Sequence, residues 1–260
     1  YAIYARQILG LRALAPVNEA PNAALKGTIF HKALKLFTQS HKDGAIGPQH
    51  LDQLIEIATP LFAPWEHHYE VRYFWWPQFI AVARWFVEAD NDLRQDGDIS
   101  FAEAQGVVDI TIGDRQFTVT TKADRIVRHD DGTVSIIDYK TGDAPAKKRV
   151  EGGRSAQMLV EAGLIANGGY QTITTGAKVR QLAYWELKGR NKDVGKKKDV
   201  TPKEFDAAPL MDAITGLLAR FEDEAMPYHA EPDPKGKQDY SDYRHLARIK
   251  EWRVLEVSND

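Results

Sequence analysis

The sequence contains no cysteine, no long apolar run and no excess of positive charge. Without cysteine, disulfides, thiolate zinc sites and iron–sulfur clusters cannot form within this chain. No apolar stretch is long enough to cross a bilayer and no signal peptide is visible, so we expect a cytoplasmic protein with no membrane partner. Because the formal net charge is −3, any nucleic-acid site must be a local basic surface.

Size and composition are those of an ordinary soluble globular protein. The chain has 260 residues, of which 43% are hydrophobic and 27% charged, enough for one large domain or a core with a helical appendage. The sequence starts at Tyr1 rather than Met, and we expect it to be a fragment of a larger protein.

The first hundred residues have helical periodicity. Apolar residues at helical spacing predict a helix over residues 23–38, and a second helical stretch over 51–93 with breaks at Pro60, Pro64 and Pro77. Nine aromatic residues fall between 65 and 86. They favour a helical core, and a base-stacking platform is the alternative.

The pattern changes to short runs of branched residues at Ile99. Three strands joined by tight turns are predicted, and they form an antiparallel meander over 100–112, 115–128 and 133–140. Further along, we expect a helix over 155–166, a strand over 177–187 and a mobile basic loop over 188–203. Another helix is expected over 202–225, and a last short helix beyond Tyr240. This order predicts a small α/β core preceded by a helical insertion.

Asp138 and Lys140 are the strongest local chemical signal. They lie two positions apart at the end of an apolar strand, so both project from one face while Tyr139 points the other way. A carboxylate and the adjacent main-chain carbonyl suit a hard divalent cation, and a lysine can stabilise charge on a phosphate. Alone, the pair favours a surface ion pair at the strand end, because Asp-x-Lys often occurs by chance.

Asp124 lies on the preceding strand, and the hairpin register decides its position. If residues 128 and 133 pair, Asp124 faces Ile137; with a tighter turn it faces Tyr139. Both registers place Asp124 within one residue of Asp138, where two carboxylates could share a metal ion. The alternative is a solvent-facing Asp124 paired with Arg125 or Lys122.

Two helices carry further candidates. His31 lies beside an apolar stripe and could add an imidazole ligand that favours an ion such as manganese. Gln157 and Glu161, at positions i and i+4, share one helix face, where the amide could bind a phosphate or a water. For His31 the alternative is an ordinary structural role. For Gln157 and Glu161 it is an ordinary exposed polar face.

Together these motifs resemble the RecB-like branch of the PD-(D/E)xK nucleases. That pattern is a helical Gly-x-x-x-His, an Asp in a strand context like Ala-Asp-Arg-Ile, the run Asp-Tyr-Lys-Thr-Gly, and a helix with Gln. This chain carries Gly27 to His31, Ala123 to Ile126, Asp138 to Gly142, and Gln157 in that order. The combination is far more specific than any single motif.

The resemblance implies a restriction-endonuclease-like α/β fold: a central mixed sheet with an antiparallel meander, flanked by helices, plus a helical insertion. We expect a single nuclease domain over residues 1–260. Within it, the insertion would cover 40–98, the catalytic sheet and helix 100–187, and a C-terminal tail packing on the body 227–260.

The resemblance also implies roles for individual residues. His31, Asp124, Asp138 and the backbone carbonyl of Tyr139 would hold Mg²⁺ or Mn²⁺. Asp124, Asp138 and Lys140 would be catalytic, with Gln157 as the accessory residue, in the hydrolysis of a DNA phosphodiester. Glu103 and Glu161 are possible outer groups.

The flanks are most similar to the C-terminal nuclease domain of AddB, a subunit of the bacterial AddAB helicase–nuclease that processes double-strand breaks. Tyr1 to Arg6, Gly168 to Tyr170 and Tyr243 to Leu246 carry this similarity. It implies exonuclease activity, an AddA-type partner subunit and a place in the bacterial cytoplasm. A stand-alone Cas4-like exonuclease and a non-catalytic DNA-binding scaffold are the alternatives.

Two features depart from those relatives. Many of them pin the two ends of the domain with four cysteines around an iron–sulfur cluster, which this chain cannot do. We expect its ends to be held by packing instead, through Trp252 and the helix at residues 1–14. Many relatives also carry Tyr four residues after the Gln, where this chain has Glu161.

Basic residues just after the catalytic strand are expected to contact DNA phosphates. They are Lys147, Lys148, Arg149 and Arg154. A second basic run, Lys192 and Lys196 to Lys198, is a weaker candidate, for which a solvated surface is the preferred interpretation.

Overall fold

The structure is a computed structural model that describes residues 2–12, 14, 20–94, 98–190, 192–229, 243 and 245–248. The chain divides into two compact units. One runs from Ala20 to Leu217, and the other joins Tyr1–Glu19 to Leu218–Asp260. The predicted catalytic residues all belong to the unit that begins at Ala20.

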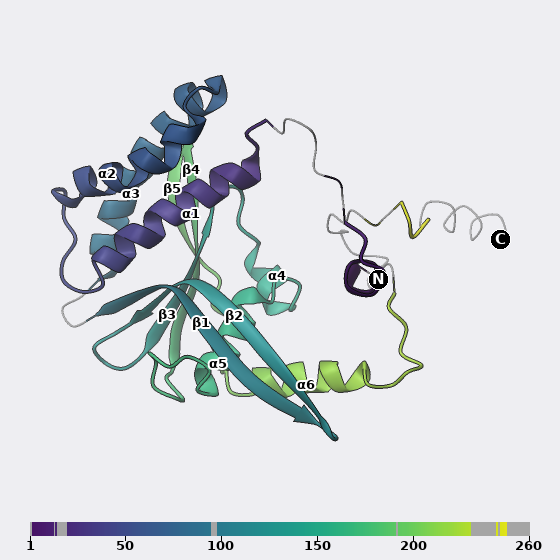
Figure 1. Cartoon of the computed structure of the whole chain (residues 1–260). Helices are drawn as coiled ribbons and strands as arrows, with labels where there is room; N and C mark the ends of the chain where they lie inside the picture. Colours follow the sequence, from purple (N-terminus) through teal and green to yellow (C-terminus); the bar gives the residue numbers. More distant parts are fainter. Residues whose placement is uncertain are drawn as a thin grey trace. The chain divides into compact units, whose positions relative to one another are not determined.

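A five-stranded mixed sheet forms the centre of that unit (Figure 1). The strands lie in the order β1-β2-β3-β4-β5, and only β3 and β4 are parallel. Their bounds are β1 Ile99–Ile112, β2 Arg115–Arg128, β3 Val134–Lys140, β4 Val179–Arg190 and β5 Asp193–Asp199. The predicted meander and mixed sheet are therefore confirmed, and the first three strands lie within a residue of their predicted bounds.

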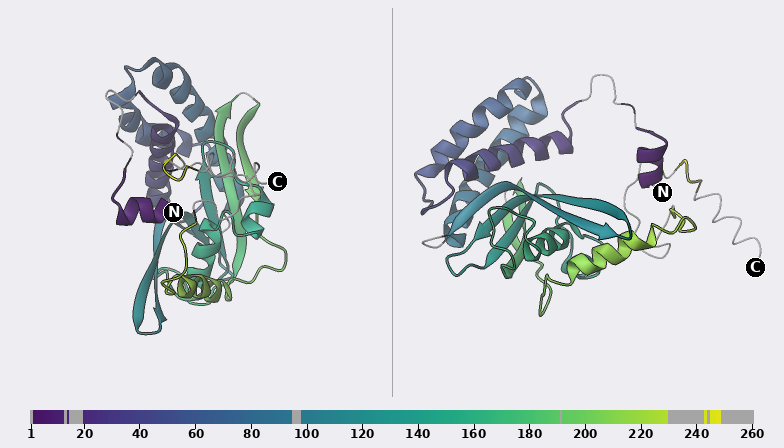
Figure 2. Two further views of the ribbon diagram at one scale, coloured as in Figure 1. Left: turned by 90° about the vertical axis from the view of Figure 1, so that its right-hand side faces the viewer. Right: turned by 60° about the horizontal axis from the view of Figure 1, so that its bottom comes forward.

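Helices cover both faces of the sheet (Figures 1 and 2). On the first face α1 (Ala23–Ser40) and α3 (Trp76–Leu93) pack on the strands, and α2 (His50–Phe62) packs on these two helices; α5 (Gln157–Ala166) covers the other face. The helix α1 begins where the Asn22 side chain accepts a hydrogen bond from Leu25 N at 2.9 Å, a typical N-cap. No helix in the described part of the chain is long and apolar enough to cross a membrane.

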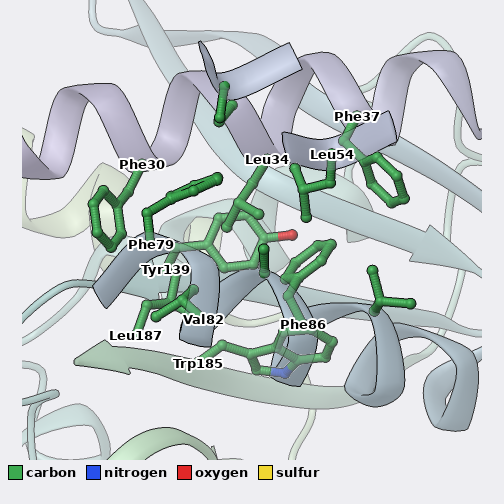
Figure 3. Packing of buried hydrophobic residues seen from close by; sticks show 14 of the residues in the cluster. Phe30, Leu34, Phe37, Leu54, Phe79, Val82, Phe86, Tyr139, Trp185 and Leu187 are labelled. Carbon is green, nitrogen blue, oxygen red and sulfur yellow. The ribbon is translucent and has the colours of Figure 1, made fainter. Parts of the chain in front are cut away.

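Several large aromatic residues form part of the core between α1–α3 and the sheet (Figure 3). Phe30 meets Phe79 edge-on at 5.1 Å, and Phe86 meets Trp185 at 5.6 Å between ring centroids. Tyr139 lies in the same cluster, with 2% of its surface exposed. The interpretation of the aromatic segment as a helical core is confirmed for Phe79 and Phe86, which pack on the sheet face opposite the side chains predicted to be catalytic.

The predicted loop over 188–203 is wrong. β4 continues to Arg190, and β5 follows as a strand at the edge of the sheet. Its lysines looked like loop residues, but lysine is one of the residues that proteins place on edge strands to prevent further pairing. Lys197 also lies 5.4 Å from the Trp185 ring, so its apolar stem covers part of the core.

Other boundaries differ from the sequence prediction. Pro60 lies inside α2 and does not break it, whereas Pro64 and Pro77 fall in first turns, at N-terminal positions where proline is tolerated. A short helix, α4 (Lys147–Glu151), occupies a segment predicted as loop, and α6 (Leu210–Arg220) is shorter than the predicted helix. The predicted last helix falls largely outside the described residues, as does Trp252.

In the second unit, described residues among the first twelve contact described residues beyond Leu218. It contains the π-helix η1 (Tyr4–Ile8). The Tyr4 and Tyr228 rings lie 6.4 Å apart, and Phe221 stacks on Tyr228 at 5.3 Å. The Tyr243 hydroxyl donates a hydrogen bond to the Leu11 carbonyl at 2.8 Å. These contacts are aromatic packing and hydrogen bonding, whereas the expected contact through Trp252 lies outside the described residues. The packing of residues 227–260 on the body remains a prediction.

The tip of β4 sits tightly against α3, and Gly189 permits that approach. Gly189 has φ +64°, and a Cβ there would lie 2.5 Å from the Gln78 carbonyl oxygen. We expect Gly189→Ala to lower the free energy of unfolding by about 1–3 kcal/mol through steric overlap and backbone strain. The control is Gly176→Ala, because Gly176 has φ +76° but no neighbour within 4 Å. Urea denaturation measures both variants, and an equal loss in both would show that the clash is absent.

Candidate active site

The candidate site lies where two strands separate. The pairing of β2 with β3 extends from Arg128–Val134 only as far as Arg125–Ile137. Beyond this point β2 continues with β1 alone, while β3 continues beside β4. Asp124 and Asp138 are the first residues past the last pair, one on each strand. This separation, called the fork below, leaves an opening between the two strands, with the carboxylates of Asp124 and Asp138 at its base.

The Asp124 side chain accepts a hydrogen bond from the backbone of β3 at this fork. Its Oδ2 accepts a hydrogen bond from Tyr139 N at 2.9 Å, an amide that strand pairing no longer satisfies. Continuing the register one step puts Asp124 directly opposite Asp138, midway between the two registers considered from the sequence. The alternative of an Asp124 paired with Arg125 or Lys122 is wrong. Arg125 pairs with Asp90, and Lys122 pairs with Glu103.

Side chains on one face of β3 pack in the core, and those on the other face belong to the candidate site. Tyr139 points into the aromatic cluster under α1–α3, and the side chains of Asp138 and Lys140 leave the opposite face. Lys140 Nζ lies 2.6 Å from Asp138 Oδ2, without hydrogen-bond geometry. Asp138 is 1% exposed, whereas the Lys140 side chain keeps 34% of its surface. The lysine therefore reaches from a buried carboxylate toward solvent.

His31 approaches the same point from α1. Its Nδ1 lies 3.4 Å from Asp124 Oδ2, and its side chain is 31% exposed. The imidazole also meets the Tyr139 ring edge-on, with centroids 5.8 Å apart. Gly27, one turn earlier on α1, lies against Thr141: a Cβ on Gly27 would be 3.5 Å from the Thr141 hydroxyl. Close packing of α1 on the end of β3 thus brings His31 to the fork.

The helix α5 supplies the other wall. Gln157 Nε2 donates a hydrogen bond to Glu161 Oε1 at 3.2 Å, as the i, i+4 spacing allows. Gln157 is exposed, but Glu161 is only 1% exposed. An ordinary exposed polar face therefore does not describe this part of the helix. Sequence alone gave no signal that Glu161 is buried.

The surroundings shift the pKa values of the three acidic groups in different directions. Burial, reinforced by the charge of Asp124, raises the pKa of Asp138 against the opposing effect of Lys140. Burial also opposes ionisation of Asp124, but the His31 contact and the Tyr139 amide hold its pKa below the ordinary value. Burial, with Asp138 and Asp124 nearby, raises the pKa of Glu161 to about 8. Such opposed shifts in one cleft are typical of functional sites.

The donor set fits a hard divalent cation. Carboxylate oxygens from Asp124 and Asp138, with a main-chain carbonyl at Tyr139, are the ligands that Mg²⁺ prefers, and His31 adds a nitrogen suited to Mn²⁺. Asp138 Oδ2 is buried without a hydrogen-bond partner. In the part of the chain that the structure describes, no group of three or more acidic or histidine side chains is arranged so that it could hold a metal ion by itself. An open set suits an ion that retains water and binds a phosphate oxygen.

The remaining candidates lie farther out. Glu103 lies on β1, between the residues that pair with Arg125 and Ala123, and has φ +49°. Its carboxylate contacts Lys35 and Lys122, so it neutralises these two lysines. The expected DNA contacts Lys147, Lys148 and Arg149 lie on α4, with Arg154 in the turn after it. In the weaker run, Lys198 Nζ donates to the Ala144 carbonyl at 2.9 Å, which gives it a structural contact.

Sequence reasoning missed a buried ion pair behind the site. Arg125 is fully buried next to Asp124 and forms an ion pair with Asp90 of α3. Its guanidinium also donates to the Ser100 hydroxyl at 2.8 Å. An arginine that follows an aspartate looks like that aspartate's partner, so only the fold could assign it to Asp90. The pair fixes the backbone that carries Asp124.

Comparison with protein families shows the superfamily to which the chain belongs. The model of the PD-(D/E)XK nuclease superfamily matches residues 1–243 of the chain. The chain belongs to this superfamily. The observed mixed sheet flanked by helices is the restriction-endonuclease-like fold expected for it.

Individual relatives of this PD-(D/E)XK protein come from Rickettsia. The uncharacterized protein RC0550 of Rickettsia conorii is 27% identical over 173 residues, which cover 65% of this chain and 21% of the relative. An uncharacterized protein of Rickettsia bellii is 26% identical, with coverage of 65% and 20%. The chain thus spans about a fifth of the length of these relatives. A solved structure, "Crystal structure of SSO0001", aligns over 79% of each chain at 12% identity with a TM-score of 0.28.

Proposed function

We propose that this chain hydrolyses phosphodiester bonds of DNA with a divalent metal ion, Mg²⁺ or Mn²⁺. The observation that carries the proposal is the fork between β2 and β3, where Asp124 and Asp138 meet and Lys140 projects beside them. Membership of a nuclease superfamily supports the same reading. The proposed groups come from two strands of the sheet and from α1, and they meet at the fork.

The residues of the fork would divide the work. His31, Asp124, Asp138 and the Tyr139 carbonyl would hold the ion, which when bound acts as a Lewis acid toward water and phosphate. Lys140 would bind the scissile phosphate and stabilise the negative charge that develops on it. The Tyr139 amide holds Asp124 in place. Gln157, exposed at the opening, would contact a phosphate or the attacking water.

Basic residues near the fork would guide the DNA backbone. Lys147, Lys148, Arg149 and Arg154 follow β3 closely in the chain, and at least Lys148 and Arg154 are exposed. They would neutralise backbone phosphates on the way to the site. The chain as a whole carries a net charge of −3, so such a local surface is required for DNA binding.

The test is cleavage of linear single-stranded and double-stranded DNA by the purified chain. We expect cleavage with Mg²⁺ or Mn²⁺ and none with EDTA, because phosphate activation depends on the ion. Asp124→Asn serves as the matched site variant and Asp114→Asn, in the β1–β2 turn, as the control. Cleavage that survives EDTA, or that Asp124→Asn leaves intact, would refute the proposal. Binding of DNA without cleavage under any metal would favour a scaffold.

A finer proposal concerns the whole protein. We infer that the chain is the exonuclease part of an AddB-type helicase–nuclease subunit, acting with an AddA-type partner at double-strand breaks in the bacterial cytoplasm. Its support is the similarity of Tyr1 to Arg6 and Tyr243 to Leu246 to that domain, and relatives several times longer than the matched segment. Co-purification of the full-length protein with an ATP-dependent helicase subunit would test it, and a full-length protein isolated without one would argue against it.

A further inference from the structure

Glu161 is a buried acid without an evident structural task. It is 1% exposed on α5. Its Oε1 accepts the Gln157 hydrogen bond, but Oε2 is buried without a hydrogen-bond partner among the described residues. Burying a carboxyl oxygen with no partner is costly, and a leucine or methionine would fill the same space more cheaply. An acid kept at such a cost indicates that a ligand completes its coordination.

The helix that carries Glu161 packs on the strands that carry Asp124 and Asp138. α5 packs against the face of the sheet from which Asp138 projects. The charges of Asp138 and Asp124 both raise the pKa of Glu161, and those of Asp138 and Glu161 both raise the pKa of Tyr184 on β4. These charge effects agree with the packing of α5 on β3, the strand that carries Asp138. Asp138 likewise has a buried Oδ2 without a hydrogen bond.

We propose that Glu161 is a metal ligand, and that its Oε2 and Asp138 together hold a second divalent cation at the fork. The inference rests on the proposed nuclease function and extends it. His31 and Asp124 would hold the first ion and Glu161 the second, and Asp138 would be shared between them. Two-metal nuclease sites hold their ions about 3.5–4 Å apart around a shared ligand set.

Gln157 gains a defined role in this arrangement. Its amide donates to Glu161 Oε1, which leaves Oε2 as the free ligand atom. Outer hydrogen bonds of this kind orient a ligating carboxylate. Gln157 is therefore a positioning residue for Glu161 as well as a candidate for contact with DNA.

The experiment counts bound ions directly. Mn²⁺ is titrated into the 260-residue chain, and free Mn²⁺ is read from its electron paramagnetic resonance signal. We expect two ions per wild-type chain, one for Glu161→Gln, and two for the control Glu151→Gln on α4, whose side chain is exposed. Glu161→Asp keeps the carboxylate but shortens it, and we expect it to weaken the second ion by roughly 10- to 100-fold.

Thermal unfolding separates a ligand from a structural acid. In EDTA, Glu161→Gln should melt close to the wild type, because the amide replaces an acid that has no partner on Oε2. Added Mn²⁺ should raise the melting temperature of the wild type more than that of the variant, since an ion that binds only the native state stabilises it. A variant that melts equally lower with and without metal would overturn the inference and leave Glu161 a structural residue.

The remaining outcomes discriminate between the two proposals. One ion per wild-type chain with metal-dependent cleavage intact would overturn the second site and leave the nuclease function standing. An unchanged count and affinity in Glu161→Gln would do the same. A wild-type chain that binds no ion and cleaves no DNA would overturn both.

Discussion

Lys140→Ala is expected to lower kcat for DNA cleavage by about 10²–10³-fold, the loss typical of removing one donor that stabilises transition-state charge. Lys140 projects beside Asp138 with a third of its surface exposed, so it can reach a phosphate. Because its effect is on the charge that develops during reaction, kcat should fall while KM changes little. Steady-state cleavage of a fluorescent oligonucleotide gives both parameters.

Two controls bear on the Lys140 result. Lys178→Ala removes an exposed lysine just before β4, at the opposite end of the strand from Lys140, and should leave the rate within about twofold. Lys140→Arg keeps the charge, but a planar guanidinium does not replace a compact ammonium, so it should restore little activity. Mn²⁺ binding should persist in Lys140→Ala. A variant that keeps more than a tenth of the wild-type kcat would show that Lys140 is not catalytic.

The fork was predictable from the sequence because it depends on local rules. Strand alternation places Asp138 and Lys140 on one face, and the hairpin turn places Asp124 opposite within a residue. Both consequences hold in the structure, where the register lies between the two considered. The functional roles of these residues still await the experiments above.

Long-range partners could not be predicted, because no local rule specifies them. The sequence predicts an exposed helical position for Glu161, and only the packing of α5 on the sheet buries it. In the same way, β5 reads as a loop because its lysines suit solvent. Its pairing with β4 and its edge position explain them.

Glu103 shows a further limit of sequence reasoning. The left-handed backbone at this position, φ +49°, is unusual for a non-glycine residue and costs on the order of 1–3 kcal/mol. Its partners Lys35 and Lys122 come from α1 and β2, so three elements converge on it. Strain compensated by contacts from several elements is visible only in the folded chain.

Arg125→Met is expected to lower the free energy of unfolding by about 3–5 kcal/mol, the loss typical when one partner of a buried ion pair is removed. Methionine fills much of the arginine volume but leaves Asp90 buried, with Arg94 as its remaining ion-pair partner. Urea denaturation measures the loss, and Arg84→Met, on the exposed side of α3, controls for the substitution itself. An unfolding free energy within about 1 kcal/mol of the wild type would show that the pair contributes little.

Arg125→Met should also reduce cleavage, which links the buried pair to the fork. Arg125 follows Asp124 directly, and its guanidinium ties β2 to Asp90 on α3 and to Ser100 on β1. Without that anchor, Asp124 would be held mainly by the Tyr139 amide and His31. Activity of the folded variant, measured well below its unfolding temperature, should therefore fall while Lys140 and Asp138 are unchanged. Full activity in a destabilised variant would mean that the fork holds its own geometry, with Arg125 serving the core alone.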